Sequence, residues 1–179
     1  MLDKKLVVLF PGINYSVDMP LLYYAGFTYE ARGYECLKIN YGNAFDEKRE
    51  FEHSLEVAKR VVLEQLEKID FSIYDNVVFV SKSIGTVIAG WVQYTMGITV
   101  NNIYLTPLEE TLPYMTKEDQ IIVVVAGTKD KYIQAERLKE YCEKENIDLH
   151  LIEGVGNRLE IFGDMSKNIE VLKEIAGLY

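Results

Sequence analysis

A serine in a short turn is the first residue of the sequence whose position could support catalysis. Ser83 lies in the segment 81–86 (SKSIGT), which follows the apolar residues 77–80 and leads directly into an apolar helical pattern. A strand, a sharp turn and a helix in this order present a serine hydroxyl for nucleophilic attack. The amide of Ile84, at the start of that helix, would face a developing oxyanion. A serine that only caps the helix is the alternative interpretation.

Two further loops follow apolar runs and carry residues that could complete such a site. Gly12 follows the first run, and a glycine there lets the backbone approach a ligand, so that the Ile13 amide could be a second oxyanion donor. Asp130 ends the segment 127–130 (GTKD) and places a carboxylate just beyond another run. Each loop also has a simpler interpretation, as a plain turn or as a helix cap. Ligands of open parallel sheets gather at the carboxyl ends of the strands, where these loops are expected.

The elements that must position these residues alternate along the chain. Short apolar runs predict strands over 6–10, 35–40, 77–80, 102–105, 121–126 and 149–153. Helical periodicity predicts helices over 20–31, 47–69, 84–96, 133–145 and 166–178, whereas 105–121 has no clear helix. Several strands are continuously apolar, as in a parallel sheet that is covered on both faces. We therefore expect an α/β fold, a three-layer doubly wound sandwich of about six mostly parallel strands, without room for a lid.

Composition excludes several other classes of protein. The 179 residues, 49% hydrophobic and 26% charged, predict one domain over residues 1–179. The net charge of −9 argues against a nucleic-acid partner. No run is long enough for a membrane span, and the N-terminus does not resemble a signal peptide, so we expect a cytoplasmic protein. Two cysteines and two histidines in no ligand motif predict reduced thiols, no metal and no cofactor.

The order of Ser83, Asp130 and the loop after the last strand resembles the α/β-hydrolase family, in which a serine, an acid and a histidine follow one another. The resemblance covers almost the whole chain and is closest to small, lidless, uncharacterised bacterial members with a Ser-Lys-Ser-Ile-Gly nucleophile elbow. The segments 21–24 (LLYY), 39–42 (INYG) and 104–107 (YLTP) fit it as well. It implies that Ser83 is the nucleophile, Asp130 the acid, and Ile13 and Ile84 the oxyanion donors.

The sequence departs from this pattern at one position. The resemblance places the catalytic histidine at residue 157, and here that residue is Asn157. An amide has no nitrogen that titrates near neutral pH, so it can orient Ser83 but cannot take its proton. His53 and Lys82 are possible substitute bases, while His150 lies too far from the carboxyl end of its strand. Ordinary triad catalysis is therefore in doubt.

Two functions follow from these observations, and a third is weaker. The first is a serine hydrolase of esterase or thioesterase type, impaired by Asn157, acting on a small acyl substrate. The second is a non-catalytic protein that binds a small acyl or carboxylate ligand on the same fold. A flavodoxin-like nucleotide or flavin binder would need a phosphate loop after the first strand, where residues 11–14 (PGIN) are a poor one. The sequence leaves the substrate and the oligomeric state open.

A pocket for such a ligand is expected among loop residues. We expect its lining to consist of Gly12, Tyr15, Lys82, Tyr41 and Thr106. Further polar and aromatic candidates are Asp18, Tyr23 and Tyr24, although most aromatic side chains simply pack.

Overall fold

The computed structural model describes residues 3–45 and 50–179 and has one parallel sheet between two layers of helices. The strands are β1 (Lys5–Phe10), β2 (Glu35–Lys38), β3 (Asn76–Lys82), β4 (Asn101–Leu105), β5 (Gln120–Gly127) and β6 (Leu149–Ile152). Their spatial order is β2-β1-β3-β4-β5-β6, and neighbouring strands of this order pair in parallel. This confirms the predicted doubly wound sandwich.

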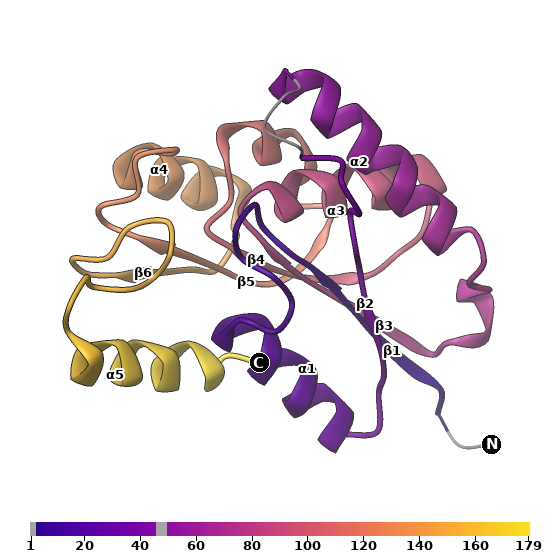
Figure 1. The fold of residues 1–179 in the computed structure, drawn as a ribbon, viewed down its shortest axis with the longest axis horizontal. Helices are drawn as coiled ribbons and strands as arrows, with labels where there is room; N and C mark the ends of the chain where they lie inside the picture. The colour runs from indigo at the N-terminus through magenta and orange to yellow at the C-terminus, as the bar shows by residue number, and fades with distance from the viewer. Residues whose placement is uncertain (1–2, 46–49) are drawn as a thin grey trace.

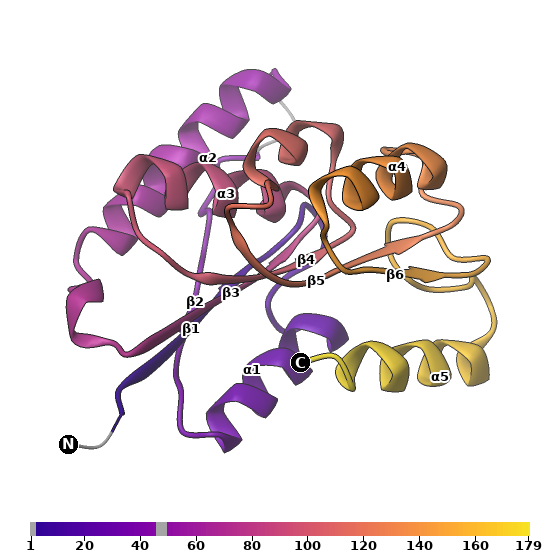
Figure 2. The ribbon, with the colours of Figure 1, turned by 180° about the vertical axis from the view of Figure 1, so that it is seen from behind.

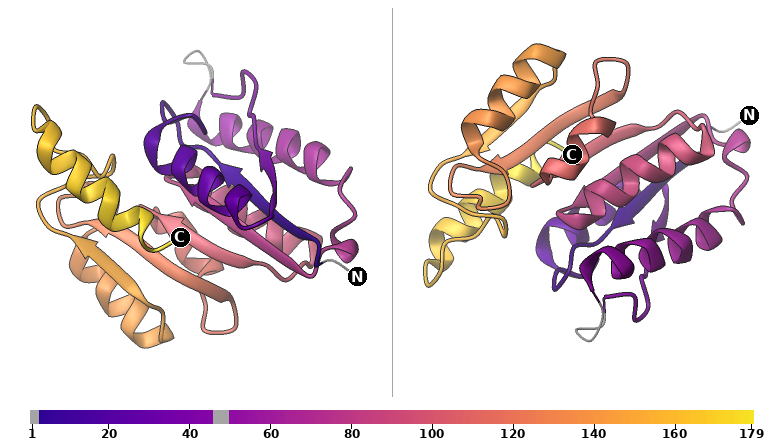
Figure 3. Two further views of the ribbon diagram at one scale, coloured as in Figure 1. Left: turned by 90° about the horizontal axis from the view of Figure 1, so that it is seen from below. Right: turned by 90° about the horizontal axis from the view of Figure 1, so that it is seen from above.

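The helices divide between the two faces of the sheet. They are α1 (Pro20–Ala31), α2 (Phe51–Leu66), α3 (Ile84–Met96), α4 (Ala135–Glu145) and α5 (Met165–Ala176). Figures 1 and 2 show α1 and α5 on one face and α2, α3 and α4 on the other, and the two end views of Figure 3 show the same layers. Among the described residues, no helix is long and apolar enough to cross a membrane.

The apolar strands are buried on both faces because successive side chains alternate between them. In β1, Val7 and Leu9 pack into the core beneath α1 and α5, whereas Leu6, Val8 and Phe10 pack beneath α2 and α3. All five are at most 2% exposed. A third cluster lies beneath α4. The sheet is therefore a rigid support whose carboxyl ends carry the loops identified from the sequence.

Most predicted elements agree with the observed bounds, and the differences are at their ends. The helix expected over 47–69 begins at Phe51, because Glu50 has an extended backbone, and it ends at Leu66; residues 47–49 lie outside the described part of the chain. The strand expected over 35–40 ends at Lys38. The link 105–121, expected to lack a clear helix, contains a 3-10 helix (η2, Glu109–Tyr114), and a second one (η1, Phe71–Ile73) precedes β3.

Strand β3 continues two residues beyond its prediction, to Lys82. Ser81 pairs with Tyr104 and Lys82 with Leu105 in the ladder with β4. The predicted strand ended at residue 80 because Ser81 and Lys82 are polar, but both side chains are buried and hydrogen-bonded in the structure. The extension brings the sheet directly up to Ser83.

Candidate active site

Ser83 occupies the sharp turn between β3 and α3. Its backbone angles are φ 53° and ψ −122°, outside the regions that a residue with a side chain ordinarily adopts. The Ser83 amide donates to the Leu105 oxygen at 2.9 Å, and the Ser83 oxygen accepts from the Thr86 amide at 2.8 Å. The sharp turn from strand to helix is thus fixed from both sides.

Two glycines allow the loop after β1 to lie against this turn. A Cβ atom on Gly85 would stand 2.5 Å from the Pro11 oxygen, and one on Gly12 would stand 3.3 Å from the Ser83 Cβ. The end of β1 is therefore the segment that lies closest to Gly85.

The two amides proposed as oxyanion donors lie in these adjoining segments. Ile13 is in a turn closed by a hydrogen bond from the Tyr15 amide to the Gly12 oxygen, and Asn14 in that turn has φ 56°. Ile84 is the first residue of α3. Within the described ranges, the amide of neither isoleucine donates a backbone hydrogen bond in a turn, loop or cap. Both N–H groups are therefore available to an anionic or carbonyl oxygen.

Asp130 and Asn157 are brought together from the loops after β5 and β6. The Asn157 Nδ2 donates to Asp130 Oδ2 at 3.1 Å, and Asp130 Oδ1 accepts from the Tyr132 amide at 2.9 Å. Asp130 is 8% exposed. Asp130 and Asn157, which the resemblance named as the acid and as the residue at the histidine position, are thus in direct contact through an amide–carboxylate hydrogen bond.

The same two loops are joined along their backbones. The Lys129 amide donates to the Val155 oxygen at 2.8 Å, and the Gly154 amide donates to Thr128 Oγ1 at 2.9 Å. A side chain at Gly127 would overlap the Val155 main chain. The geometry around Asp130 therefore depends on the fit of the β6 loop.

Lys82 lies beneath the site, where its contacts with other loops were not predicted from the sequence. Its side chain is 1% exposed, and its Nζ donates to Thr106 Oγ1 at 2.7 Å and to the Asn157 main-chain oxygen at 2.6 Å. Burial lowers the pKa of Lys82 to about 7, while the Asp130 carboxylate raises it in part. The available signal in the sequence was the position of Lys82, which follows the apolar run 77–80 after a single serine and directly precedes Ser83.

A cleft of about 580 Å³ adjoins the β1 loop. Gly12, Ile13, Tyr15 and Tyr41 line it, and the Tyr41 hydroxyl donates to the Pro11 oxygen at 2.8 Å. Asp18 also lines the cleft, where it pairs with Lys38 at 3.3 Å.

Other residues expected in the pocket lie elsewhere. Lys82 and Thr106 are not among the residues that line this cleft, because both are buried below the loops. Tyr23 and Tyr24 are about half exposed on α1 and do not line it either. The side of the cleft nearest the turn is therefore formed by the β1 loop.

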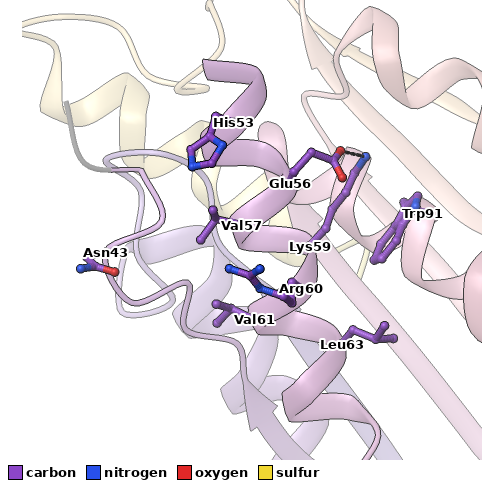
Figure 4. Close-up of a pocket in the computed structure, with 9 residues that line it drawn as sticks. All are labelled: Asn43, His53, Glu56, Val57, Lys59, Arg60, Val61, Leu63 and Trp91. Atoms are coloured by element: carbon purple, nitrogen blue, oxygen red, sulfur yellow. Dashed lines mark hydrogen bonds and ion pairs between the residues drawn. The ribbon is translucent and has the colours of Figure 1, made fainter. Parts of the chain in front are cut away.

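Neither histidine is joined to the site. His53 is exposed on α2 and lines a separate cleft with Asn43, Arg60 and Trp91, which Figure 4 shows. His150 lies within β6 and its Nε2 is 2.7 Å from Glu174 Oε1 on α5. The role of substitute base suggested for His53 has no support in these contacts.

Comparison with solved structures shows which fold this is. A Xanthomonas campestris protein assigned to the α/β-hydrolase superfamily superposes with a TM-score of 0.69 at 16% identity, covering 98% of this chain and 97% of its own. A lidless α/β serine hydrolase from the same species has a TM-score of 0.62 at 13% identity, covering 97% and 79%. The chain has a minimal, lidless α/β-hydrolase fold.

Est1E from Butyrivibrio proteoclasticus, solved with ferulic acid bound, superposes on this α/β-hydrolase fold with a TM-score of 0.68 at 11% identity, covering 98% of this chain and 88% of its own. No family model matches the sequence, and no curated protein matches it. Within the α/β-hydrolase fold, the loops after β1, β3, β5 and β6 carry the site described above.

Proposed function

We propose that the protein is a serine acyl hydrolase of low turnover that acts on a small ester or thioester. The observation that carries this proposal is the Ser83 turn, whose unusual backbone is held next to two unused amides. A strained conformation at a surface turn is costly and is commonly retained for function. The solved hydrolases with the same fold are consistent with it.

In the proposed reaction, the Ser83 Oγ attacks the acyl carbon. A bond forms between that oxygen and the carbon, and the carbonyl electron pair moves onto the oxyanion, which accepts hydrogen bonds from the Ile13 and Ile84 amides. The Ser83 proton passes to water, because Asn157 has no nitrogen that can accept it. The carbonyl re-forms as the bond from the acyl carbon to the alcohol oxygen or thiol sulfur breaks, and the leaving group takes a proton from water. Water then attacks the acyl carbon, the bond to Ser83 Oγ breaks, and the acid is released while Ser83 regains its proton. Without a positioned base, about a thousand-fold acceleration over water is expected.

A second candidate is a binding protein that holds a small acyl or carboxylate ligand without turning it over. The pairing of Asn157 with Asp130 favours it, since both side chains are engaged in a contact that needs no proton transfer. The ligand would occupy the cleft formed by the β1 loop and accept a hydrogen bond from the Ile13 amide there.

Hydrolysis of p-nitrophenyl acetate and of an acetyl thioester separates the two candidates. The hydrolase proposal expects slow turnover that disappears in Ser83→Ala and persists in Ser72→Ala, an exposed serine whose hydroxyl binds Asp70. A rate that is equal in both variants would reject Ser83 as the nucleophile. Saturable binding of acetate or ferulate without any Ser83-dependent turnover would favour the binding protein.

A further inference from the structure

The Lys82 side chain connects two of the loops that form the site. Its Nζ lies 2.7 Å from Thr106 Oγ1, after β4, and 2.6 Å from the Asn157 oxygen, after β6. The Tyr15 ring, from the β1 loop, lies 5.1 Å from the same nitrogen. Three loops separated by many residues in the sequence thus meet at one amine.

The number of donors on Lys82 matches these partners. An ammonium group has three N–H bonds, of which Thr106 and Asn157 take two and the face of Tyr15 can receive the third. A neutral amine keeps two N–H bonds, so both hydrogen bonds can survive the loss of a proton. The bond to Asn157 is stronger in the charged form, because charge-assisted hydrogen bonds exceed neutral ones.

Residue 157 is therefore held at two points. Lys82 binds its main-chain oxygen, and Asp130 binds its side-chain amide. We propose that Lys82 is a positioning residue of this site, whose Nζ fixes the main chain at Asn157 and so keeps the residue-157 side chain within reach of Asp130. The inference deepens the proposed function and rests on it, since the placement of residue 157 matters for chemistry only if Ser83 reacts.

The charged groups around Lys82 make this positioning dependent on pH. Asp130 and Glu160 favour the charged amine, whereas Arg158 and, above all, burial disfavour it. The pKa of Lys82 near 7 means that both forms are populated around neutral pH. The strength with which the Asn157 oxygen is held should change over the same range.

Two measurements on wild type, Lys82→Met and Lys59→Met test the inference. Lys59→Met is the matched control, because that lysine, on α2, pairs with Glu56 and lies over the Trp91 ring of α3. NMR follows the Asn157 side-chain amide from about pH 5.5 to 8.5, with the resonance assigned by its loss in Asn157→Ala. A fluorophosphonate probe measures the rate at which Ser83 is labelled over the same range.

We expect the Asn157 resonance to titrate with a midpoint near the pKa of Lys82 in wild type and in Lys59→Met, and not to titrate in Lys82→Met. Labelling should slow about tenfold in Lys82→Met, because the residue-157 side chain, whose amide can orient the Ser83 hydroxyl, then loses its position. The ratio of wild-type to Lys82→Met rates should change with the same midpoint. Titration that persists in Lys82→Met, or equal behaviour of the two methionine variants, would overturn the inference.

Two outcomes need separate treatment. If Ser83 is not labelled in any variant, the proposed function fails, while the Asn157 resonance still decides the role of Lys82. If Lys82→Met does not fold, Thr106→Val replaces it, because it removes one acceptor of the amine and keeps the other. The midpoint should then fall below that of wild type, and an unchanged midpoint would contradict the role.

Discussion

The Asn157 side chain donates a hydrogen bond of 3.1 Å to the Asp130 carboxylate. In a catalytic triad the histidine imidazole occupies this place. The acid orients the imidazole, which takes a proton from the serine and later gives it up. Here the group beside the carboxylate is an amide, which the carboxylate can orient but which has no nitrogen that accepts a proton near neutral pH.

Removal of the acid should destabilise the fold. In Asp130→Ala, both the Asn157 amide and the Tyr132 amide lose their acceptor, so the free energy of unfolding should fall by about 1–3 kcal/mol. Urea denaturation measures the change. Asp75→Ala, which removes an exposed acceptor of the Lys4 amide, is the control and should cost less. An equal loss of unfolding free energy in the two variants would argue that Asp130 does not stabilise the contact between the loops after β5 and β6.

Relief of the backbone strain at Ser83 should stabilise the protein. Glycine adopts positive φ without a steric penalty, so Ser83→Gly should raise the free energy of unfolding by roughly 1 kcal/mol at the expense of the nucleophile. Thermal denaturation provides the measurement. Ser81→Gly, within β3, should lower stability instead. A loss of stability in both variants would mean that the Ser83 turn is not strained.

Gly85 should not tolerate even one additional carbon. In Gly85→Ala, the new Cβ would lie 2.5 Å from the Pro11 oxygen, which is main chain and cannot rotate away. We expect a loss of about 1–3 kcal/mol of unfolding free energy, together with a slower reaction of Ser83. Gly177→Ala is a suitable control, because Gly177 has φ −72° and its nearest neighbour would be 3.3 Å away. Similar effects of the two substitutions would be inconsistent with the close contact at Gly85.

Stability should rise with pH above neutrality because of Lys82. Its pKa is about 7 in the folded protein and 10.5 in the unfolded chain, so the unfolded state binds more protons between these values. The cost of burying the charge is present in full below pH 7 and decreases as the pH rises. From pH 7 to 9 the free energy of unfolding should rise by about 2 kcal/mol. Urea denaturation at each pH measures this rise.

Above pH 9 the ionisation of buried thiol and phenol groups should lower the free energy of unfolding again. Burial raises the pKa of Cys142 to about 11 and that of Tyr15 to about 12, so the unfolded chain loses these protons first. Lys82→Met should remove the rise between pH 7 and 9 and leave the later decline. A rise that remains in Lys82→Met would assign the effect to another residue.

The fold was predictable because its signals are local. Pro20 at the start of α1 and Gly97 just beyond α3 mark two helices whose bounds the sequence predicted without error. The strand pattern likewise predicted a sheet covered on both faces. The ends of α2 and β2 were less well predicted, because partly buried termini depend on their tertiary contacts.

The sequence predicted which residues belong to the candidate site, but not all of the contacts between them. Asp130 and Asn157 were placed by resemblance, and the structure brings them into contact. Lys82 was expected to line a pocket, whereas it is buried and binds a main-chain oxygen 75 residues away. Such a contact depends on how two loops meet, and no spacing in the sequence encodes it.

The most direct test of the central claim is the substitution Asn157→His, assayed with p-nitrophenyl butyrate. If a triad lacks only its base, turnover should rise by at least about a hundred-fold, with an apparent pKa near that of histidine, and the gain should disappear with Ser83→Ala and shrink with Asp130→Asn. Asn43→His, at an exposed position, is the control and should leave the rate unchanged. A folded Asn157→His protein with wild-type turnover would contradict the account.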